Sequence, residues 1–450
     1  MSNLSVFMND NANHYPISHV AKNEWLDFAM YTVEARAIPS MIDGMKPVQR
    51  FYLYSSIVNS KKDFKKVSAV SGIISDYGYN HGETSAAAAG QLMAAEWNNN
   101  VCLIEGRGSF GTRLIQEAGA PRYVYTRLSE NFNRYITDID LSPTHEDPEH
   151  APPKFYAPII PLVLVNGQRG IATGFATHIL PRCPLDVAAA CREFIETGSI
   201  TKDLHLKFPQ FNGRVERDAD PKKFTVFGNY RKKGKTTLLI TEVPYGFDRE
   251  SYVKILDGLE DEGDIVSYDD LCNKDGFRFE VKLKQNISAK WSSKQIVSKF
   301  KLSKPLTENL TVIGPEGGLK EYDDARELIK DFCNWRLNFL QKRIDQKVAD
   351  HTEEARWLDV RLKFIEAVRT KEIDIMNMNR AETTKKTVEV TGCAVNEVGK
   401  LLTMPIASIM KSEPATFKRF ITEANKKLKF WKTTTTKKQY IADLDELNEI

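Results

Sequence analysis

The segment Ala118-Gly119-Ala120-Pro121-Arg122-Tyr123-Val124-Tyr125-Thr126-Arg127-Leu128, residues 118–128, gives the first indication of the fold. Its glycine and proline favour a turn, because glycine tolerates left-handed backbone angles and proline fixes φ. The run that follows, residues 123–128, contains aromatic and β-branched residues, which favour a strand. We therefore expect a turn that leads through Tyr123 into a strand.

Three helix-compatible segments lie upstream of this strand. Residues 24–37 have helical character, Pro47 opens a second helix at a favoured first-turn position, and an alanine-rich third spans residues 84–97. Polar residues at 80–84 offer capping side chains to the third helix. A further β-prone run covers residues 101–105. Three helices followed by β-prone runs predict a helix-turn-helix with a wing, whose last helix can enter a DNA groove.

From about residue 152 the sequence changes to short β-prone runs with frequent glycine and proline. These runs cover residues 159–165, 224–227, 236–241 and 277–282. They predict an α+β second domain that reaches to about residue 316.

Residues 319–391 contain neither glycine nor proline, and their apolar residues recur at helical spacing. About 50 helical residues would be on the order of 75 Å long at about 1.5 Å per residue. Residues 417–428 and 440–450 could return antiparallel, beyond a compact knot around residues 401–410, with a loop at 433–436. We expect a long antiparallel coiled coil with a globular tip that carries a dimer contact. A helix packed on an ordinary helical domain stays open as the alternative.

The composition is that of a globular protein: 42% of the 450 residues are hydrophobic and 27% are charged. The longest apolar stretch, residues 157–165, is too short to cross a bilayer, and residues 1–20 lack the features of a signal peptide, so we expect an intracellular, soluble protein. The six cysteines lie far apart without a Cys-x-x-Cys motif, and we interpret them as reduced and structural.

The net charge is only +3, so any nucleic-acid surface must be a local patch. Each candidate is also compatible with an ordinary solvated surface. The candidates are residues 61–66, Arg107, Arg113, Arg122, Arg127, Arg134, and residues 231–235.

Some motifs in the chain point to chemistry that their context does not support. Residues 106–111 match G-x-G-x-x-G, but Gly119 and Pro121 follow too soon for the long helix of a dinucleotide fold. The glycine-rich residues 167–174 lack the Lys-Ser/Thr of a P-loop, so no ATP site is visible. Asp138, Asp140, His145 and His150 do not complete a coordination shell, and we predict no metal site in this chain.

Five motif regions within about 150 residues give these candidates a context. They are residues 35–39 (ARAIP) with 43–50 (DGMKPVQR), 79–83 (YNHGE), 105–111 (EGRGSFG), 122–126 (RYVYT), and 161–167 (PLVLVNG) with 170–174 (GIATG). In this order they resemble the breakage-reunion subunits of type IIA DNA topoisomerases, a family that includes gyrase A subunits. The similarity is greatest to the medium subunits of T4-like phages, which are separate from the ATPase polypeptide.

The resemblance implies an enzyme that makes a transient double-strand break through phosphotyrosyl links. Tyr123 is then the nucleophile, and because a free phenol has a pKa near 10, such a tyrosine needs activation to attack phosphorus. Arg122 would stabilise charge on the phosphate oxygens with a fork geometry that lysine matches poorly. His81 and Arg36 are implied as further phosphate-side groups.

A second set of residues is implied to bind DNA. Lys46, Gln49, Arg50 and Tyr79 would position the backbone, which carries no sequence information by itself. Ile171 would act as an apolar wedge that unstacks and bends the duplex, and Gly170 would permit the close backbone approach. Ordinary core packing is the alternative for Ile171.

Cofactors and partners also follow from the resemblance. Mg²⁺ would be held mainly by a Toprim domain and ATP by a GHKL-type ATPase domain, both on a partner large subunit. The chain would form a homodimer through winged-helix and C-gate contacts and bind double-stranded DNA. It would not associate with a membrane. It would reside in the cytoplasm, which is that of the host cell if the protein is phage-encoded. Because little sequence follows the expected coiled coil, we expect ATP-dependent relaxation and not introduction of negative supercoils.

The resulting prediction is an α+β multidomain protein. Its segments are an N-terminal arm (1–20), a winged-helix breakage-reunion domain (21–150), a tower domain (151–316), and a coiled coil with a C-gate dimerisation domain (317–450). One rival is a catalytically silent DNA-bridging or clamp protein on the same scaffold. Another rival is a tyrosine recombinase or relaxase, but the multiple Arg/His set and the His-hydrophobic-His motif of those classes are not evident in this sequence.

Overall fold

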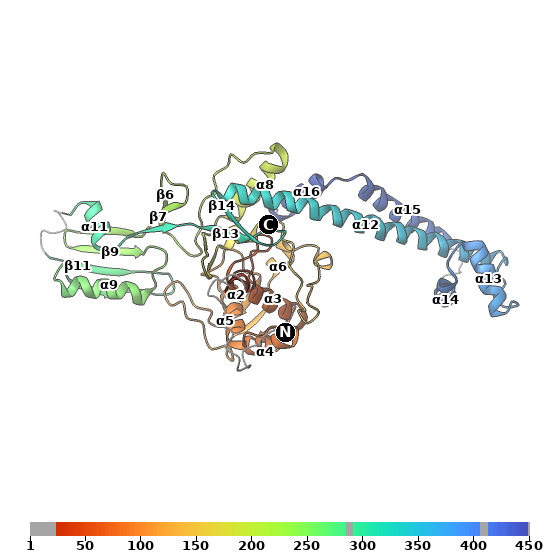
Figure 1. The fold of residues 1–450 in the computed structure, drawn as a ribbon, viewed down its shortest axis with the longest axis horizontal. Coiled ribbons are helices and arrows are strands. Elements are labelled where there is room, and N and C mark those ends of the chain that lie inside the picture. Colours follow the sequence, from red (N-terminus) through yellow and green to blue (C-terminus); the bar gives the residue numbers. More distant parts are fainter. Residues whose placement is uncertain (1–23, 285–290, 406–412, 449–450) are drawn as a thin grey trace, which may run out of the picture. The chain divides into compact units, whose positions relative to one another are not determined.

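The computed structural model describes residues 24–284, 291–405 and 413–448. It divides into two compact units (Figure 1). The first takes in the chain up to Trp335 and again from Leu444, and the second comprises Arg336–Asp443. The predicted division of the first unit near residue 150 stays a prediction.

The first unit begins with short helices, as the sequence predicts. They are α2 (Glu24–Thr32), the π-helical η2 (Val33–Ala37), α3 (Pro47–Asn59), α4 (Val67–Gly72), the 3₁₀ turn η3 (Ile74–Tyr77) and α5 (Glu83–Ala94). Pro47 does open α3, at the first-turn position where a missing N–H costs nothing. Helices α3, α4 and α5 pack on one another.

A three-stranded antiparallel sheet adjoins these helices, in the order β1-β3-β2. Its strands are β1 (Lys65–Lys66), β2 (Ile104–Arg107) and β3 (Tyr125–Leu128). The buried Tyr52 of α3 connects helices and sheet, since its hydroxyl lies 2.7 Å from Thr126 Oγ1. Gly90 of α5 makes room for the Tyr52 ring, because a Cβ there would lie 2.2 Å from ring carbons.

Two local predictions in this region are wrong. The third helix ends at Ala94 and not at Trp97, and no side chain caps its start: the N-cap is Gly82, at φ 86°. A left-handed N-cap suits glycine and leaves the polar side chains of residues 80–84 to other partners. The predicted strand at residues 159–165 is instead the short helix α7 (Leu162–Asn166). Residues 162–165 are buried on every side, and periodicity cannot distinguish a short apolar strand from a buried helix.

The remainder of the first unit is mainly β-structure, and three of its four predicted strands are confirmed. The helical elements here are α6 (Glu130–Tyr135), the 3₁₀ turn η4 (Ile139–Leu141), α8 (Pro184–Thr197), α9 (Arg249–Asp261) and α11 (Ser293–Lys299). Two hairpins are formed by β4 (Gln168–Ile171) with β5 (Ala176–Ile179) and by β13 (Leu310–Ile313) with β14 (Leu319–Tyr322). One sheet consists of β6 (Arg214–Arg217), β7 (Lys223–Phe227) and β12 (Ser303–Thr307), and another of β8 (Asn229–Lys233), β9 (Thr237–Glu242), β10 (Ile265–Asp270) and β11 (Phe279–Leu283).

The four-stranded β8–β11 sheet has the order β10-β11-β9-β8, and α9 packs along it (Figure 1). Tyr252 and Leu256 of α9 share a buried apolar cluster with Ile240, Phe279 and other residues of the sheet. We call this sheet with α9 and α11 the α9 layer.

The second unit is built on the long helix α12 (Ala325–Arg369), whose 45 residues amount to about 68 Å at about 1.5 Å per residue. It is followed by α13 (Arg380–Thr391), η5 (Val395–Glu397), α14 (Val398–Leu402), α15 (Glu413–Thr433) and α16 (Thr436–Asn448). The predicted long helix, the two later helices and the loop between them are confirmed, while part of the predicted knot at 401–410 lies outside the described residues.

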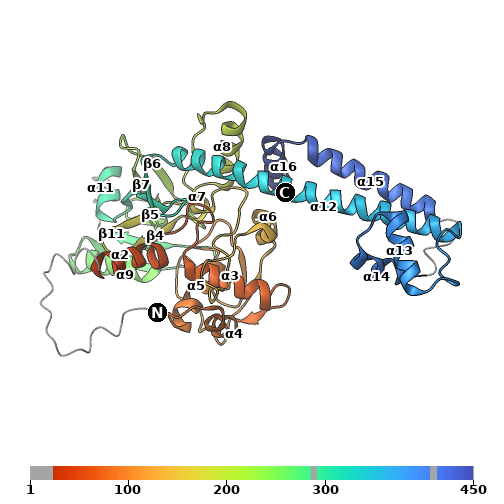
Figure 2. The ribbon, with the colours of Figure 1, turned by 45° about the vertical axis from the view of Figure 1, so that its right-hand side comes forward.

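Helices α15 and α16 run antiparallel to α12, as expected. Phe417 of α15 packs on Leu362 and Ile365 near the end of α12, whereas Asp443 of α16 pairs with Arg336 and Arg343 much earlier in α12. Figure 2 shows α15 lying beside the later part of α12. Arg336 is fully buried, so its ion pair with Asp443 is shielded from water.

The chain carries no described helix that is both long and apolar enough to cross a membrane. All six cysteines fall within the described ranges, and no disulfide bond joins any two of them.

The Asp443 pair generates a prediction about stability. Asp443→Ala removes the carboxylate that two buried guanidinium groups share, and removing one partner of a buried ion pair costs about 3–5 kcal/mol. We expect the α12–α16 region to unfold at a markedly lower urea concentration, measured by hydrogen exchange. The control Glu366→Ala removes the exposed Lys418–Glu366 bridge between α12 and α15, which should cost at most about 1 kcal/mol. Equal losses in the two variants would contradict the prediction.

Candidate active site and DNA-binding surface

The turn that carries Tyr123 is fixed through its main chain. The first two amides of α4, Val67 N and Ser68 N, donate to the carbonyls of Val124 (3.0 Å) and Pro121 (3.1 Å). Strand β3 begins at Tyr125, so sheet pairing continues the constraint. The Tyr123 side chain, by contrast, is 68% exposed. A rigid backbone therefore presents a phenol to the surface.

The glycine-rich segment at residues 105–111 packs against this turn. Gly119 N donates to Ser109 O (2.9 Å), which closes the loop between β2 and β3. Gly108 has φ 113° and lies so near Val124 that a Cβ would be 3.1 Å from its Cγ1. No helix follows β2 directly, so the rejection of a dinucleotide fold is confirmed.

Arg122 lies directly beside the phenol. Its guanidinium carbon is 4.7 Å from the centre of the Tyr123 ring, and both residues are exposed. Among the described residues, no carboxylate forms an ion pair with Arg122. A positive charge and a potential nucleophile therefore share one surface.

His81 and Arg36 are also brought together, and Tyr31 joins them. Arg36 Nη2 lies 3.2 Å from His81 Nδ1, and Tyr31 Oη lies 2.6 Å from His81 Nε2. Burial, with a smaller contribution from the Arg36 charge, lowers the pKa of His81. Tyr79 packs its ring edge against His81 at 5.3 Å. Sequence reasoning missed Tyr31, because nothing in its helical segment distinguishes it from a packing aromatic.

Lys46 and Gln49 lie at the start of α3. Gln49 Oε1 accepts from Lys46 N (2.9 Å) and Gln168 Nε2 (3.2 Å), and Lys46 Nζ donates to Arg169 O (2.7 Å). Burial lowers the pKa of Lys46. Both side chains therefore join α3 to the β4 hairpin.

Arg50 differs from its neighbours in this motif. Its Nε and Nη2 donate to the two carboxylate oxygens of Asp43 (2.7 and 3.1 Å), and Nη2 also donates to Met45 O (2.9 Å). Asp43 is buried, so the geometry supports a structural role for Arg50. Its predicted DNA contact stays a prediction.

Ile171 lies at the end of β4, at the tip of the β4–β5 hairpin, and is 75% exposed. The alternative of core packing is therefore wrong. Gly170, one residue earlier, is buried against η2: a Cβ there would lie 1.9 Å from Ala37 O. Only glycine fits this approach, which brings the hairpin against the segment that carries Arg36.

The other candidate arginines divide into engaged and exposed groups. Arg113 is buried and pairs with Glu242, Arg127 forms two hydrogen bonds with Glu105, and Arg134 donates to Leu447 O. The predicted patch is thus wrong for Arg113, whose charge is compensated in the interior. The exposed basic residues include Lys61, Lys62, Lys65, Lys66, Arg107 and Arg231.

No three His, Cys, Asp or Glu side chains within the described ranges are grouped so as to hold a metal ion. His145 and His150, which sequence spacing suggested as a weak pair, instead stack their rings at 3.8 Å. His150 Nδ1 lies 3.1 Å from Pro152 O. His145 and His150 are thus engaged with each other and with the main chain of the described structure.

Comparison with known proteins agrees with this geometry. A family model that describes the A subunits of DNA gyrase and topoisomerase IV matches residues 36–446. The DNA topoisomerase medium subunit of Enterobacteria phage T4 is 40% identical over 447 residues, 97% of this chain and 99% of that protein. DNA topoisomerase 2 of Saccharomyces cerevisiae is 30% identical over 379 residues, 81% of this chain but only 26% of that protein.

A solved structure supports the fold. The crystal structure of the Plasmodium falciparum topoisomerase II DNA-binding, cleavage and re-ligation domain matches with a TM-score of 0.85 at 25% identity, covering 95% of this chain and 63% of that one. The mixed α/β architecture and the resemblance drawn from the motifs are confirmed. The chain belongs to the family of DNA gyrase and topoisomerase IV A subunits, the DNA-cleaving and rejoining subunits of type II topoisomerases.

Proposed function

We propose that Tyr123 is the nucleophile of this protein, and that the protein works in an ATP-dependent type IIA topoisomerase that relaxes superhelical DNA. The observation that carries the proposal is the exposed phenol on a fixed main chain with a guanidinium 4.7 Å from its ring. In-line attack on phosphorus requires the nucleophile to be held in position, which a rigid turn provides.

The proposed step exchanges one phosphodiester for another. The Tyr123 oxygen forms a bond to phosphorus, the bond between phosphorus and a sugar oxygen breaks, and the phenolic proton ends on the sugar hydroxyl that leaves. Arg122 lies where it can donate to the phosphate oxygens as charge develops on them. Because the phosphotyrosyl ester retains the energy of the broken link, the reverse step reseals the strand without nucleotide hydrolysis.

His81 serves in this proposal as a neutral holder of Arg36. Arginine only donates hydrogen bonds, so His81 Nδ1 must accept and the proton must lie on Nε2, from which it donates to Tyr31 Oη. The remaining N–H groups of Arg36 are then available for a DNA phosphate. A lowered pKa suits this role, because protonation of Nδ1 would remove the acceptor.

We further propose that the duplex runs over the β4–β5 hairpin. The exposed Ile171 side chain is suited to wedge between base pairs, and Phe175, 44% exposed, lies at the same tip. Asn309, the residue before β13, supports the hairpin, because its main-chain N and O pair with His178 O and N. Lys46, Gln49 and Tyr79 are proposed to line the backbone path.

Mg²⁺ and ATP are assigned in this proposal to a partner protein with Toprim and ATPase domains. In the part of the chain that the structure describes, no three His, Cys, Asp or Glu side chains assemble a metal site. Mg²⁺ would supply charge stabilisation at the transferring phosphate when the partner is bound. The finer enzyme class, type IIA (EC 5.6.2.2), is likewise part of this proposal.

Helix α2 is proposed to contact that partner. It exposes Trp25 (53%), Leu26 (47%) and Phe28 (58%), which is much apolar surface for one short helix. The same helix carries Tyr31, which bonds His81. A partner that brings a metal to the phosphate held near Arg36 would have to approach this region, so α2 is a fitting place for it to dock.

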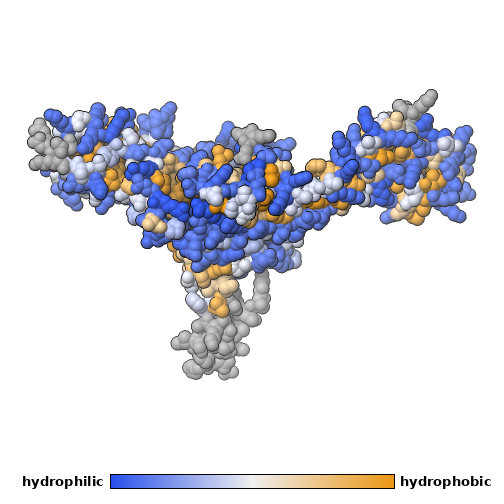
Figure 3. Space-filling model, turned by 90° about the horizontal axis from the view of Figure 1, so that it is seen from above, coloured by the Kyte–Doolittle hydropathy of each residue, from blue (hydrophilic) through white to orange (hydrophobic). Residues whose placement is uncertain are grey.

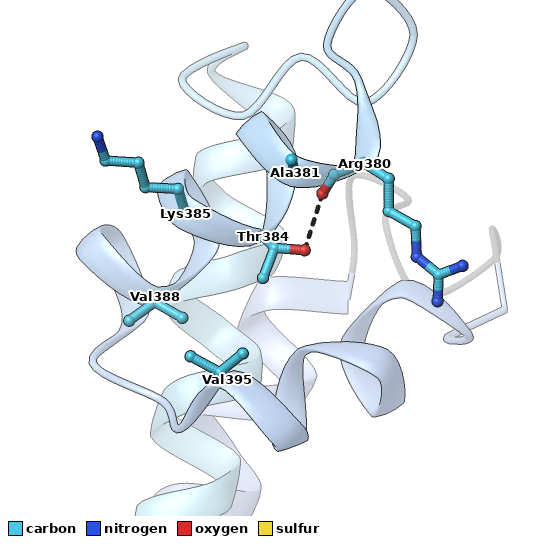
Figure 4. A pocket seen from close by; sticks show the side chains of 6 residues that line it. All are labelled: Arg380, Ala381, Thr384, Lys385, Val388 and Val395. Carbon is cyan, nitrogen blue, oxygen red and sulfur yellow. Dashed lines mark hydrogen bonds between the residues drawn. The ribbon is translucent and has the colours of Figure 1, made fainter.

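A homodimer is proposed through the winged-helix region and through a C-gate at the tip of the second unit. This proposal interprets α3–α5 with the β1–β3 sheet as a winged helix, the α9 layer as part of the tower domain, and α12 with α15 and α16 as the coiled coil. At the tip, a cavity of about 640 Å³ lies over α13, and Val388 and Val395 project toward it (Figure 4). Thr384, which also lines the cavity, donates from Oγ1 to Arg380 O (2.8 Å).

The tip also combines apolar and hydrophilic side chains, as a dimer contact that must open and close requires. Val395 is 69% exposed, and apolar patches lie among hydrophilic side chains at this end of the molecule (Figure 3). A gate that opens and closes is served better by such a surface than by a wholly apolar one.

The first prediction concerns the nucleophile. Tyr123→Phe should abolish the covalent adduct trapped by denaturant from the complex of this chain, its partner, DNA and Mg²⁺, while duplex affinity stays unchanged. Tyr125→Phe, two residues later in β3, is the matched control and should retain the adduct. If wild type and Tyr123→Phe both give no adduct, the clamp alternative is favoured.

The second prediction concerns pH. The lowered pKa of His81 keeps the ring neutral to a lower pH than that at which an ordinary histidine is protonated, and protonation then releases Arg36. Adduct formation should therefore fall as pH decreases through that lowered pKa. His81→Gln, which keeps a neutral acceptor, should lack this inflection in a pH profile of trapped adduct. The same inflection in both proteins would exclude His81 as its source.

The third prediction concerns the partner. Phe28→Asp places a charge on the exposed face of α2 and should weaken copurification of the ATPase partner by about tenfold or more, as loss of an interface hot spot does. Phe430→Asp on α15, a residue of similar exposure (54%), is the control and should leave copurification unchanged. Undiminished binding by Phe28→Asp would place the partner elsewhere.

A further inference from the structure

The loop that follows Gly108 and ends at Gly119 contacts strand β9 and helix α9. Residues 109–119, here called the reaching loop, begin and end together because Gly119 N donates to Ser109 O (2.9 Å). Thr112 Oγ1 accepts from the amides of Leu114 and Ile115 (3.2 Å each), which gives the far end of the loop a defined turn. The reaching loop is therefore ordered along its length.

Arg113 anchors the far end of the reaching loop in an interior site. It is 5% exposed, and its Nη1 donates to Glu242 Oε1 (3.0 Å) and its Nη2 to Val243 O (3.5 Å). Three rings surround its guanidinium carbon, those of Phe211 (5.0 Å), Phe277 (5.3 Å) and Tyr245 (5.5 Å). A planar cation in an aromatic box is held in orientation as well as in place.

The receiving side of this contact is itself rigid. Glu242, the last residue of β9, also accepts from the amides of Asn212 and Val243 (3.0 Å each), so its carboxylate cannot turn freely. Next to Arg113, the carbonyl of Leu114 accepts from Arg249 N at the start of α9 (3.0 Å). The Leu114 side chain packs against the buried cluster of the α9 layer. The reaching loop thus docks on β9 and α9 by side chain and main chain together.

The near end of the reaching loop leads directly into the turn of Tyr123. Gly119 O accepts from Gln91 Nε2 of α5 (2.6 Å), and two residues later Pro121 O accepts from Ser68 N. Few residues separate Leu114 from Gly119, so the segment between them can absorb little of a displacement of the docked tip. A short segment with fixed points at both ends therefore joins the α9 layer to the turn of Tyr123.

We propose that Arg113 is a positioning residue for Tyr123, which couples the placement of the α9 layer to the alignment of the phenol with the scissile phosphate. The inference rests on the proposed nucleophilic role of Tyr123. A buried ion pair is weak evidence for stability alone, since apolar residues of similar volume often replace one without loss. Retention of the pair therefore points to a role in setting where the reaching loop sits, in addition to the stability that is lost when only one partner is removed.

The test compares Arg113→Met and Arg113→Lys with Arg127→Met in the full complex with partner, duplex and Mg²⁺. Arg127 is a matched control: it also pairs with a glutamate, Glu105, here through two hydrogen bonds, and lies over a ring, Phe64 (4.5 Å), but it is partly exposed and lies on β3, only four residues from Tyr123. The readouts are the rate and yield of trapped adduct at saturating duplex, duplex affinity, and thermal unfolding.

Arg113→Met should lower the adduct rate at saturating duplex by about tenfold or more, as slight misplacement of a reacting group does. Duplex affinity should change by less than about twofold, because the buried Arg113 side chain is not accessible to a duplex. Arg113→Lys should fall between wild type and Arg113→Met, since lysine keeps the charge for Glu242 but cannot keep the fork or the stacking. Arg127→Met should stay near wild type.

The inference is overturned if folded Arg113→Met forms adduct at the wild-type rate, if Arg127→Met is equally impaired, or if adduct and duplex affinity fall together. If Arg113→Met does not fold, Arg113→Lys decides, and a wild-type adduct rate in that variant overturns the inference. Failure of the proposed function looks different, because wild type itself would then yield no adduct that Tyr123→Phe removes.

Discussion

Two backbone hydrogen bonds, from the first amides of α4 to the carbonyls of Pro121 and Val124, are the constraint on which the site depends. The opening amides of a helix have no partners within it, so they are available to hold another segment. Here they hold the turn of Tyr123 and leave its side chain free. Positioning by the main chain makes the location of the phenol independent of the side chain's own contacts.

Close approaches that only glycine permits extend this constraint to the rest of the site. Gly170 lets the hairpin of Ile171 meet Ala37 O, and Gly108 lets the glycine-rich loop pass beneath Val124. The first contact places the candidate wedge beside the segment that carries Arg36. The glycines in the motifs are therefore packing points between main chains, which explains why they resembled ligand-binding loops in the sequence.

Sequence reasoning succeeded where local rules act alone and failed where tertiary contacts decide. Pro47 and the glycine-free, proline-free run of α12 predicted their helices correctly, because first-turn preferences and helical periodicity are local. Residues 162–165 were misassigned because complete burial removes the periodicity that separates strand from helix. Tyr31 was missed because its partner His81 lies 50 positions away, and no local pattern records that contact.

Arginines close together in the sequence have opposite environments, and this limits what charge can reveal. Arg113 is enclosed by Glu242 and three rings, whereas Arg122 is exposed beside Tyr123. Arg50, inside a motif that suggests phosphate binding, is likewise committed to Asp43. Buried guanidinium groups require carboxylate partners, so each one adds an acid as well as a base to the composition. A net charge of +3 is therefore compatible with a DNA-cleaving surface, because part of the basic residues and their acidic partners cancel in the interior.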